Sequence, residues 1–155
     1  MKAFDEFLKA TLEQAGHEAR ADGSTSIQAE HLLLAMATQS TTDVGRFLVV
    51  MGLGHGALRA ALDREFAQAL SSAGVSVDAA TRRPASSASG PVGDIGTSVR
   101  HALERGMAGL RGKPRPGHLL PGVLQAEVGS VPRALALAGI DRAALLEQVR
   151  QMLLG

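Results

Sequence analysis

Apolar residues recur at helical spacing in the first half of the chain and mark out four segments. Residues 4–21 carry apolar side chains three or four positions apart, namely Phe4, Phe7, Leu8, Leu12, Ala15 and Ala19, as on one side of an α-helix. Residues 30–38, 44–51 and 57–70 continue the pattern, with polar or glycine-containing breaks between them. Thr42 and Asp43 are residue types that cap a helix start. The pattern predicts four helices.

The pattern stops after residue 70 and returns near residue 94. Residues 71–93 are small, polar and non-periodic, which is typical of a linker. From residue 94 onward the helical pattern places Ile95, Val99, Ala102, Leu103 and Met107 on one side. We therefore expect a first unit at residues 1–70, a linker at 71–93 and a second unit at 94–155.

The second unit repeats the first at an offset of 87 residues. Residues 27–62 align with 114–149 without a gap, and the matching positions include His31 with His118, Leu32 and Leu33 with Leu119 and Leu120, Arg46 with Arg133, and Gly52 with Gly139. An ungapped match that keeps the apolar positions indicates a duplicated structural unit.

Residues 47–62 admit two interpretations. The apolar run before Gly52-x-Gly54-x-x-Ala57 has the outline of a dinucleotide-binding turn, which would follow a strand. The second unit keeps only one of these glycines, Gly139, after good helix formers. We therefore predict that Gly52 and Gly139 end helices at positive φ. A nucleotide-binding enzyme remains the alternative.

The composition and net charge of the chain limit the classes of function that we expect. The chain has 155 residues, 45% hydrophobic, with a net charge of +1 and neither tryptophan nor tyrosine. These values favour one globular domain without an electrostatic attraction to nucleic acid, although a helical DNA-binding regulator is a further alternative. No cysteine, signal peptide or long apolar run is present, so we expect a cytoplasmic monomer without a metal, cofactor or membrane span.

The doubled unit resembles the Clp N-terminal domain, or Clp repeat, of ClpA- and ClpC-type AAA+ unfoldases. The residues that carry the likeness are Ala15, Ala19, Arg20, Ile27, Glu30-His31-Leu32-Leu33-Leu34, and the segments that end in Gly52-Leu53 and Gly139-Ile140. The resemblance implies an all-α fold in which two pseudo-twofold-related four-helix repeats pack as one domain. Its repeated core would contain His31, Leu32, Leu33 and Gly52, with His118, Leu119, Leu120 and Gly139.

The resemblance implies a binding module and not an enzyme. Such domains bind protein substrates, adaptors or peptide-like ligands, in some members cyclic peptide antibiotics, and the module would regulate or protect a Clp protease. The ATPase motif of the family is absent, because Gly112-Lys113 is followed by a proline and Met107 stands where the first glycine belongs. The chain would thus be a stand-alone double repeat or a piece of a longer protein. No pattern of a catalytic triad is present either.

The same resemblance suggests ligand-binding residues. The matching glutamate of ClpC-type repeats binds phosphorylated arginine; here it is Glu30, whereas the second unit has Gly117. Phe4 and Lys9 lie near the place where cyclic peptides bind, and Arg20 is a further candidate for the groove.

The residues themselves predict three more features. We expect His31 and His118 to be buried imidazoles hydrogen-bonded to loop carbonyls, and not metal ligands. Pro121 predicts a kinked or late helix. Phe4 falls on Pro91 at the 87-residue offset, so the first helix of the second unit should begin late.

Overall fold

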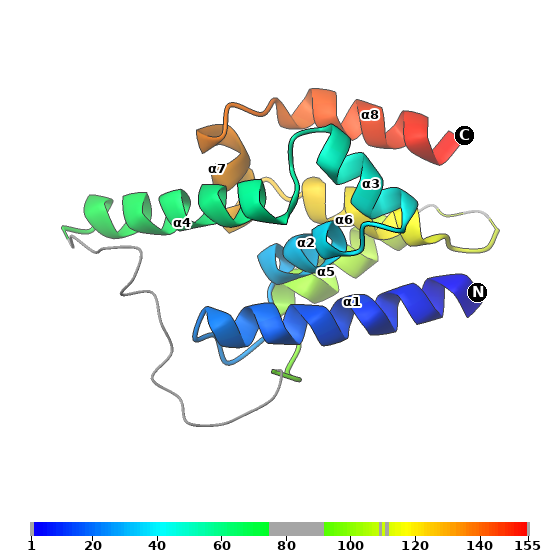
Figure 1. Cartoon of the computed structure of the whole chain (residues 1–155), viewed down its shortest axis with the longest axis horizontal. Helices are drawn as coiled ribbons and strands as arrows, with labels where there is room; N and C mark the ends of the chain where they lie inside the picture. Colours follow the sequence, from blue (N-terminus) through cyan, green and yellow to red (C-terminus); the bar gives the residue numbers. More distant parts are fainter. Residues whose placement is uncertain (1, 75–91, 109, 111, 155) are drawn as a thin grey trace.

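The computed structural model describes residues 2–74, 92–108, 110 and 112–154 (Figure 1). In these ranges the chain forms eight α-helices and one short 3₁₀-helix: α1 (Lys2–Ala21), α2 (Ala29–Thr38), α3 (Asp43–Val50), α4 (His55–Ser72), α5 (Thr97–Met107), η2 (Pro116–His118), α6 (Leu119–Leu124), α7 (Ser130–Leu137) and α8 (Arg142–Leu154). The expectation of an all-α protein is confirmed. None of the described helices is long and apolar enough to cross a membrane.

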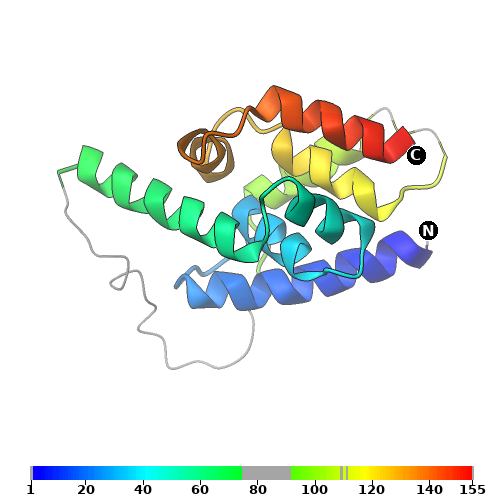
Figure 2. The ribbon, with the colours of Figure 1, turned by 45° about the horizontal axis from the view of Figure 1, so that its top comes forward.

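Helix α2 occupies the centre of the molecule. Eight of its ten residues are buried: Ala29 and the run from His31 to Ala37. A helix that is apolar on every side needs neighbours all round it, and α1, α3, α4, α5, α6 and α7 all contact it. Figures 1 and 2 show α1 along one side of the molecule and α8 along the opposite side, with α2, α5 and α6 between them.

The glycines predicted to end helices do so. Gly52 has φ 78° and follows Met51, the C-cap of α3, and Gly139 has φ 76° and follows Ala138, the C-cap of α7. Beyond each glycine the chain folds back, since Leu53 N–H donates to the Leu48 carbonyl (2.7 Å) and Ile140 N–H to the Leu135 carbonyl (2.9 Å). This is the hydrogen-bond pattern of a glycine C-cap. Residues 47–50 are therefore helical, and the strand that a dinucleotide-binding turn would follow is absent from this described segment.

Most predicted boundaries are confirmed within two or three residues. The Thr42 hydroxyl caps α3 by accepting from Gly45 N–H (3.0 Å), and Asp141 accepts from the first amides of α8. Helix α5 begins at Thr97, as late as expected, and α6 begins at Leu119 after a 3₁₀ turn, two residues before Pro121. Helix α4 continues to Ser72, so the linker was predicted to begin too early. Residues 75–91 of that linker lie outside the described residues.

Candidate functional site

A pocket of about 480 Å³ lies where α2, α5 and α7 begin. Its lining comes from the start of α2 (Gln28, Ala29, Glu30), from α5 (Thr97, Ser98, His101, Arg105) and from the segment that leads into α7 (residues 126–131). Glu30, which the sequence analysis proposed as a ligand-binding residue, thus lines a pocket. The pocket size is in the range of small-ligand sites.

Backbone hydrogen bonds connect the segment before α5 to the segment before α2. Ile27 N–H donates to the Asp94 carbonyl (2.7 Å), and Gly96 N–H donates to the Ile27 carbonyl (2.8 Å). The Ser98 hydroxyl accepts from Ala29 N–H (2.9 Å) and lies 2.6 Å from Oε1 of Gln28. Two segments about 70 residues apart in sequence are therefore hydrogen-bonded to each other and together form one wall of the pocket.

Both signs of charge line this pocket. Half-buried Glu30 and exposed Glu127 contribute carboxylates, and Arg105 and exposed His101 contribute nitrogen groups. Arg105 is held in place because its Nε donates to the Gly122 carbonyl (2.9 Å). The arrangement can receive a ligand that carries a positive and a negative group a short distance apart.

Helix α7 begins at Gly129, which lines the pocket, and α5 begins at Gly96, next to the lining residue Thr97. Gly96 and Gly129 are the N-cap residues, and neither helix has a side-chain cap. The first amide groups of a helix carry partial positive charge and need acceptors. Water or an anionic group of a ligand can supply those acceptors here, which extends the positive side of the pocket beyond Arg105.

The corresponding place in the second half is built differently. A pocket of about 490 Å³ is lined by Thr41–Val44 and Arg115–Gly117, together with Ala3, Met152 and Leu153. Gly117 stands where the first half has Glu30, and a Cβ added there would lie 2.7 Å from Cδ2 of Leu153. The Arg115 guanidinium also donates to the Leu153 carbonyl. A glutamate at position 117 would therefore require the Leu153 side chain at the end of α8 to move.

The other predicted ligand residues do not gather at these pockets. Phe4 is only 6% exposed and belongs to the core, so the prediction that its ring meets a surface ligand is not supported by this arrangement. Lys9 is exposed and Arg20 is half-buried, both on α1. They lie about 16 Å apart along the helix axis at 1.5 Å per residue. Neither residue lines any of the pockets described above.

The environment of His31 differs from the prediction. His31 is fully buried, but its Nδ1 accepts from Gln28 N–H (2.9 Å), and its Nε2 lies 3.0 Å from Oδ2 of Asp22. A backbone amide and a carboxylate are therefore its partners, and not a loop carbonyl. His118 makes the first contact as well, accepting from Arg115 N–H (2.8 Å), but it is only half-buried. The expected burial of both histidines is wrong for the second.

A network of buried and half-buried polar side chains continues from His31. Arg59 donates to Asp22 (2.7 Å) and to Glu18 (2.8 Å), and His55 Nε2 lies 2.9 Å from Glu18. Burial alone would raise the pKa of Glu18, but hydrogen bonds from Arg59 and His55 lower it below its usual value. Sequence reasoning missed this network, because its members come from the end of α1, the loop after it, α2 and α4.

Comparison with known proteins does not identify the chain. No protein-family model matches it, and no curated protein matches its sequence. Among the described residues, no group of three or more histidine, aspartate or glutamate side chains could hold a metal ion.

Proposed function

We propose that this chain is a binding module of the Clp N-terminal type, built from two repeats of four helices. The support is the offset of 87 residues, which recurs in the helix boundaries. Helix α3 spans Asp43–Val50 and α7 spans Ser130–Leu137, while α4 begins at His55 and α8 at Arg142. The histidine contacts at both helix starts follow the same offset. Repeated local bonds of this kind favour a duplicated unit over chance similarity.

The observation that carries the proposed function is the position of Glu30 in the pocket between α2, α5 and α7. In the family that the chain resembles, this glutamate meets the guanidinium of a phosphorylated arginine. A carboxylate and a guanidinium form a charge-assisted pair with two parallel hydrogen bonds. The phosphoryl group would then face the Arg105 side and the first amides of α5 or α7, which have no side-chain caps.

We propose one such site and not two. The equivalent place in the second half has Gly117 instead of a glutamate, and a Cβ at this position would meet the side chain of Leu153. The ligand would be a phosphorylated arginine of a protein substrate, or an arginine-bearing segment of an adaptor. The module would present this ligand to a Clp unfoldase or withhold it from one, without catalysing a reaction itself.

An NMR titration of ¹⁵N-labelled protein with phosphoarginine tests the site. We expect the largest shifts at the amides of residues 28–30, 97–98 and 129–131, which line the pocket. Glu30→Ala should weaken binding about tenfold or more, because a hydrogen-bonded charge pair contributes about 1.5–3 kcal/mol. Free arginine and inorganic phosphate, added separately, show which half of the ligand is recognised.

Glu104→Ala is the matched control, because Glu104 is exposed on α5 and does not line the pocket. It should bind phosphoarginine as the unchanged protein does. Equal weakening by both substitutions would show that only overall charge matters. The absence of shifts at millimolar phosphoarginine would exclude this ligand, and copurification with an unfoldase would then be the remaining test of a Clp-type module.

A further inference from the structure

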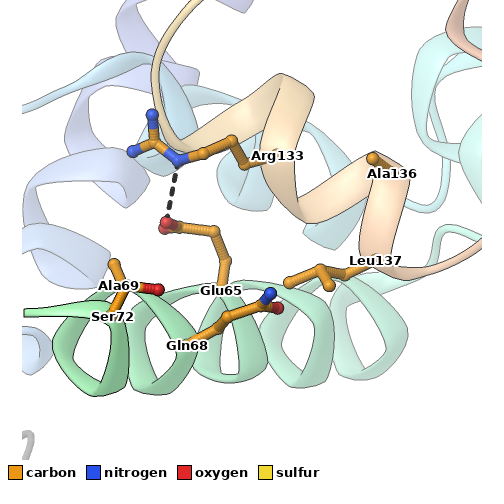
Figure 3. Close-up of a pocket in the computed structure, with 7 residues that line it drawn as sticks. All are labelled: Glu65, Gln68, Ala69, Ser72, Arg133, Ala136 and Leu137. Carbon is orange, nitrogen blue, oxygen red and sulfur yellow. Dashed lines mark hydrogen bonds and ion pairs between the residues drawn. The ribbon is translucent and has the colours of Figure 1, made fainter.

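A separate pocket lies between α4 and α7, with a volume of about 330 Å³ (Figure 3). Helix α4 contributes Glu65, Gln68, Ala69 and Ser72, and α7 contributes Arg133, Ala136 and Leu137. None of these residues lines the Glu30 pocket. Nothing in the proposed function uses this site.

The unusual group in this pocket is the carboxylate of Glu65. Glu65 is only 6% exposed, and a buried carboxylate is costly unless it is paired. Arg133 supplies the pairing, since its Nε donates to Oε2 (3.0 Å), and Figure 3 shows the Glu65 side chain rising from α4 towards this guanidinium.

The other oxygen, Oε1, has no hydrogen-bond partner among the described residues. In the described part of the chain, every side-chain oxygen that is fully shielded from solvent does have a hydrogen-bond partner. Oε1 therefore keeps contact with the open space of the pocket, where it can accept a hydrogen bond from a ligand.

The charge of the pocket disfavours a strongly ionic ligand. The lining contains one carboxylate, Glu65, and one guanidinium, Arg133, and these already neutralise each other. The Arg133 side chain is 59% exposed, and only its Nε is engaged among the described groups, so the face of its guanidinium is open. A neutral ligand that offers one donor to Oε1 fits better than a second cation or an anion.

Several of the other residues that line the pocket have small or apolar side chains. Ala69 and Ala136 leave room between the helices, and Leu137 is one of the exposed large apolar residues, at 40% exposure. An apolar group placed here would cover Leu137 and gain free energy from the removed surface. The walls thus favour a flat or bulky apolar group with one polar edge.

We propose that this pocket receives a tryptophan side chain of a partner polypeptide. The indole N–H would donate to Oε1 of Glu65, the ring would lie against the guanidinium of Arg133, and its apolar edge would cover Leu137. Tryptophan combines an apolar body with one N–H donor, and it stacks well with arginine. Buried aromatic anchors of this kind dominate many protein interfaces. A second copy of this chain cannot supply the group, because the sequence contains no tryptophan or tyrosine.

An NMR titration with N-acetyl-tryptophanamide tests this proposal directly. We expect shifts confined to the amides of residues 65–72 and 133–137. The analogue methylated at the indole nitrogen should bind about tenfold more weakly, because it loses a hydrogen bond to a charged acceptor. N-acetyl-leucinamide and N-acetyl-argininamide provide the apolar and cationic comparisons, and both should bind more weakly than the tryptophan compound.

Two variants with the same chemical change separate the pocket from the rest of the surface. Ala136→Leu fills the pocket and should abolish the shifts, whereas Ala144→Leu, at an exposed position of α8, should leave them unchanged. Equal binding of the methylated analogue would overturn the role of Glu65. Tighter binding of the arginine compound would replace the proposal with a cationic site, and shifts located elsewhere, or none, would exclude the pocket. Each of these outcomes is independent of the phosphoarginine titration.

Discussion

Helix α2 and the 3₁₀ turn η2, which leads into α6, begin with the same local bond but have different surroundings. At each start a histidine accepts a hydrogen bond from the backbone amide three residues before it, Gln28 in one half and Arg115 in the other. His31 is fully buried and also contacts Asp22, whereas His118 is half-buried. The local bond depends on nearby residues, so it recurs. The burial depends on what the rest of the fold places over the histidine.

The two halves also hold their helices together by different chemistry. In the first half, Arg59 of α4 bridges the carboxylates of Glu18 and Asp22. At the offset of 87 residues, Arg59 and Glu18 fall on Leu146 and Arg105, and the ionic bridge has no counterpart there. Arginines of the second half donate to backbone carbonyls instead, as Arg105 does to Gly122. The comparison indicates that the first half depends more strongly on charged groups for its stability.

Arg59→Met should have the largest effect on stability. The methionine keeps much of the side-chain volume but removes the positive charge beside two carboxylates that are 10% and 5% exposed. Breaking a buried ion pair on one side costs about 3–5 kcal/mol. Urea denaturation at pH 7, followed by circular dichroism, measures this loss.

Arg150→Met is the matched control, since Arg150 pairs with Glu147 on the surface of α8, where both side chains are more than half exposed. A pair of this type contributes about 0–1 kcal/mol. If the two variants lost similar stability, the bridge at Arg59 would not distinguish the first half from the second.

A second contrast lies in the helix crossings α1 with α2 and α5 with α6. The first crossing buries alanines, Ala15, Ala19 and Ala35, which are all 0% exposed. Their counterparts at the offset of 87 residues are Ala102, Gly106 and Gly122. A Cβ added at Gly122 would lie 2.0 Å from the Ala102 carbonyl oxygen. The backbones of α5 and α6 are therefore too close together for an alanine side chain, which the crossing of α1 and α2 does accommodate.

Gly122→Ala should therefore destabilise the protein by about 2–3 kcal/mol, as expected for overpacking against a backbone atom that cannot move away alone. Gly56→Ala, in the first turn of α4, has open space at its Cβ and should instead stabilise by about 0.5–1 kcal/mol through helix propensity. Thermal unfolding of both variants compares the two positions. A neutral Gly122→Ala would mean that α5 and α6 can separate at little cost.

Local sequence signals predicted the helices well. Apolar spacing located α1 to α4, Thr42 marked a helix start, and Gly52 and Gly139 marked helix ends. Each of these features depends on residues within one or two helical turns. The boundary after α4 was less accurate, because the polar residues at 71 and 72 can extend a helix as readily as leave it.

The candidate sites were harder to predict, because they join distant segments. Glu30 was chosen by resemblance, but its pocket partners Ser98 and Arg105 lie about 70 residues away and carry no motif. The pair of Glu65 and Arg133 was likewise unpredicted, since it depends on how α4 packs against α7. The burial of Phe4 was not predictable for the same reason: an aromatic residue on an amphipathic helix can face the core or a ligand, and only packing decides.

The smallest predicted effect concerns the pH dependence at His118. Burial, and then the positive charge of Arg115, lower the pKa of this imidazole below its usual value of 6.5. The hydrogen bond from Arg115 N–H also needs the lone pair of Nδ1, which only the neutral ring offers. Since the folded pKa is below the unfolded one, the contribution of His118 to stability is complete above pH 6.5 and is lost as pH falls through the folded pKa.

His118→Gln should therefore flatten the loss of stability between pH 7.5 and 5. Urea midpoints across this range measure the slope, and an NMR titration of the His118 ring measures its pKa. A ring pKa above 6.5 would reverse the sign and show that a negative group approaches the imidazole. Because the shift at His118 arises from modest burial and one neighbouring arginine, its effect on stability should stay well below the loss expected at Arg59, where a half-buried charge bridges two helices and a loop.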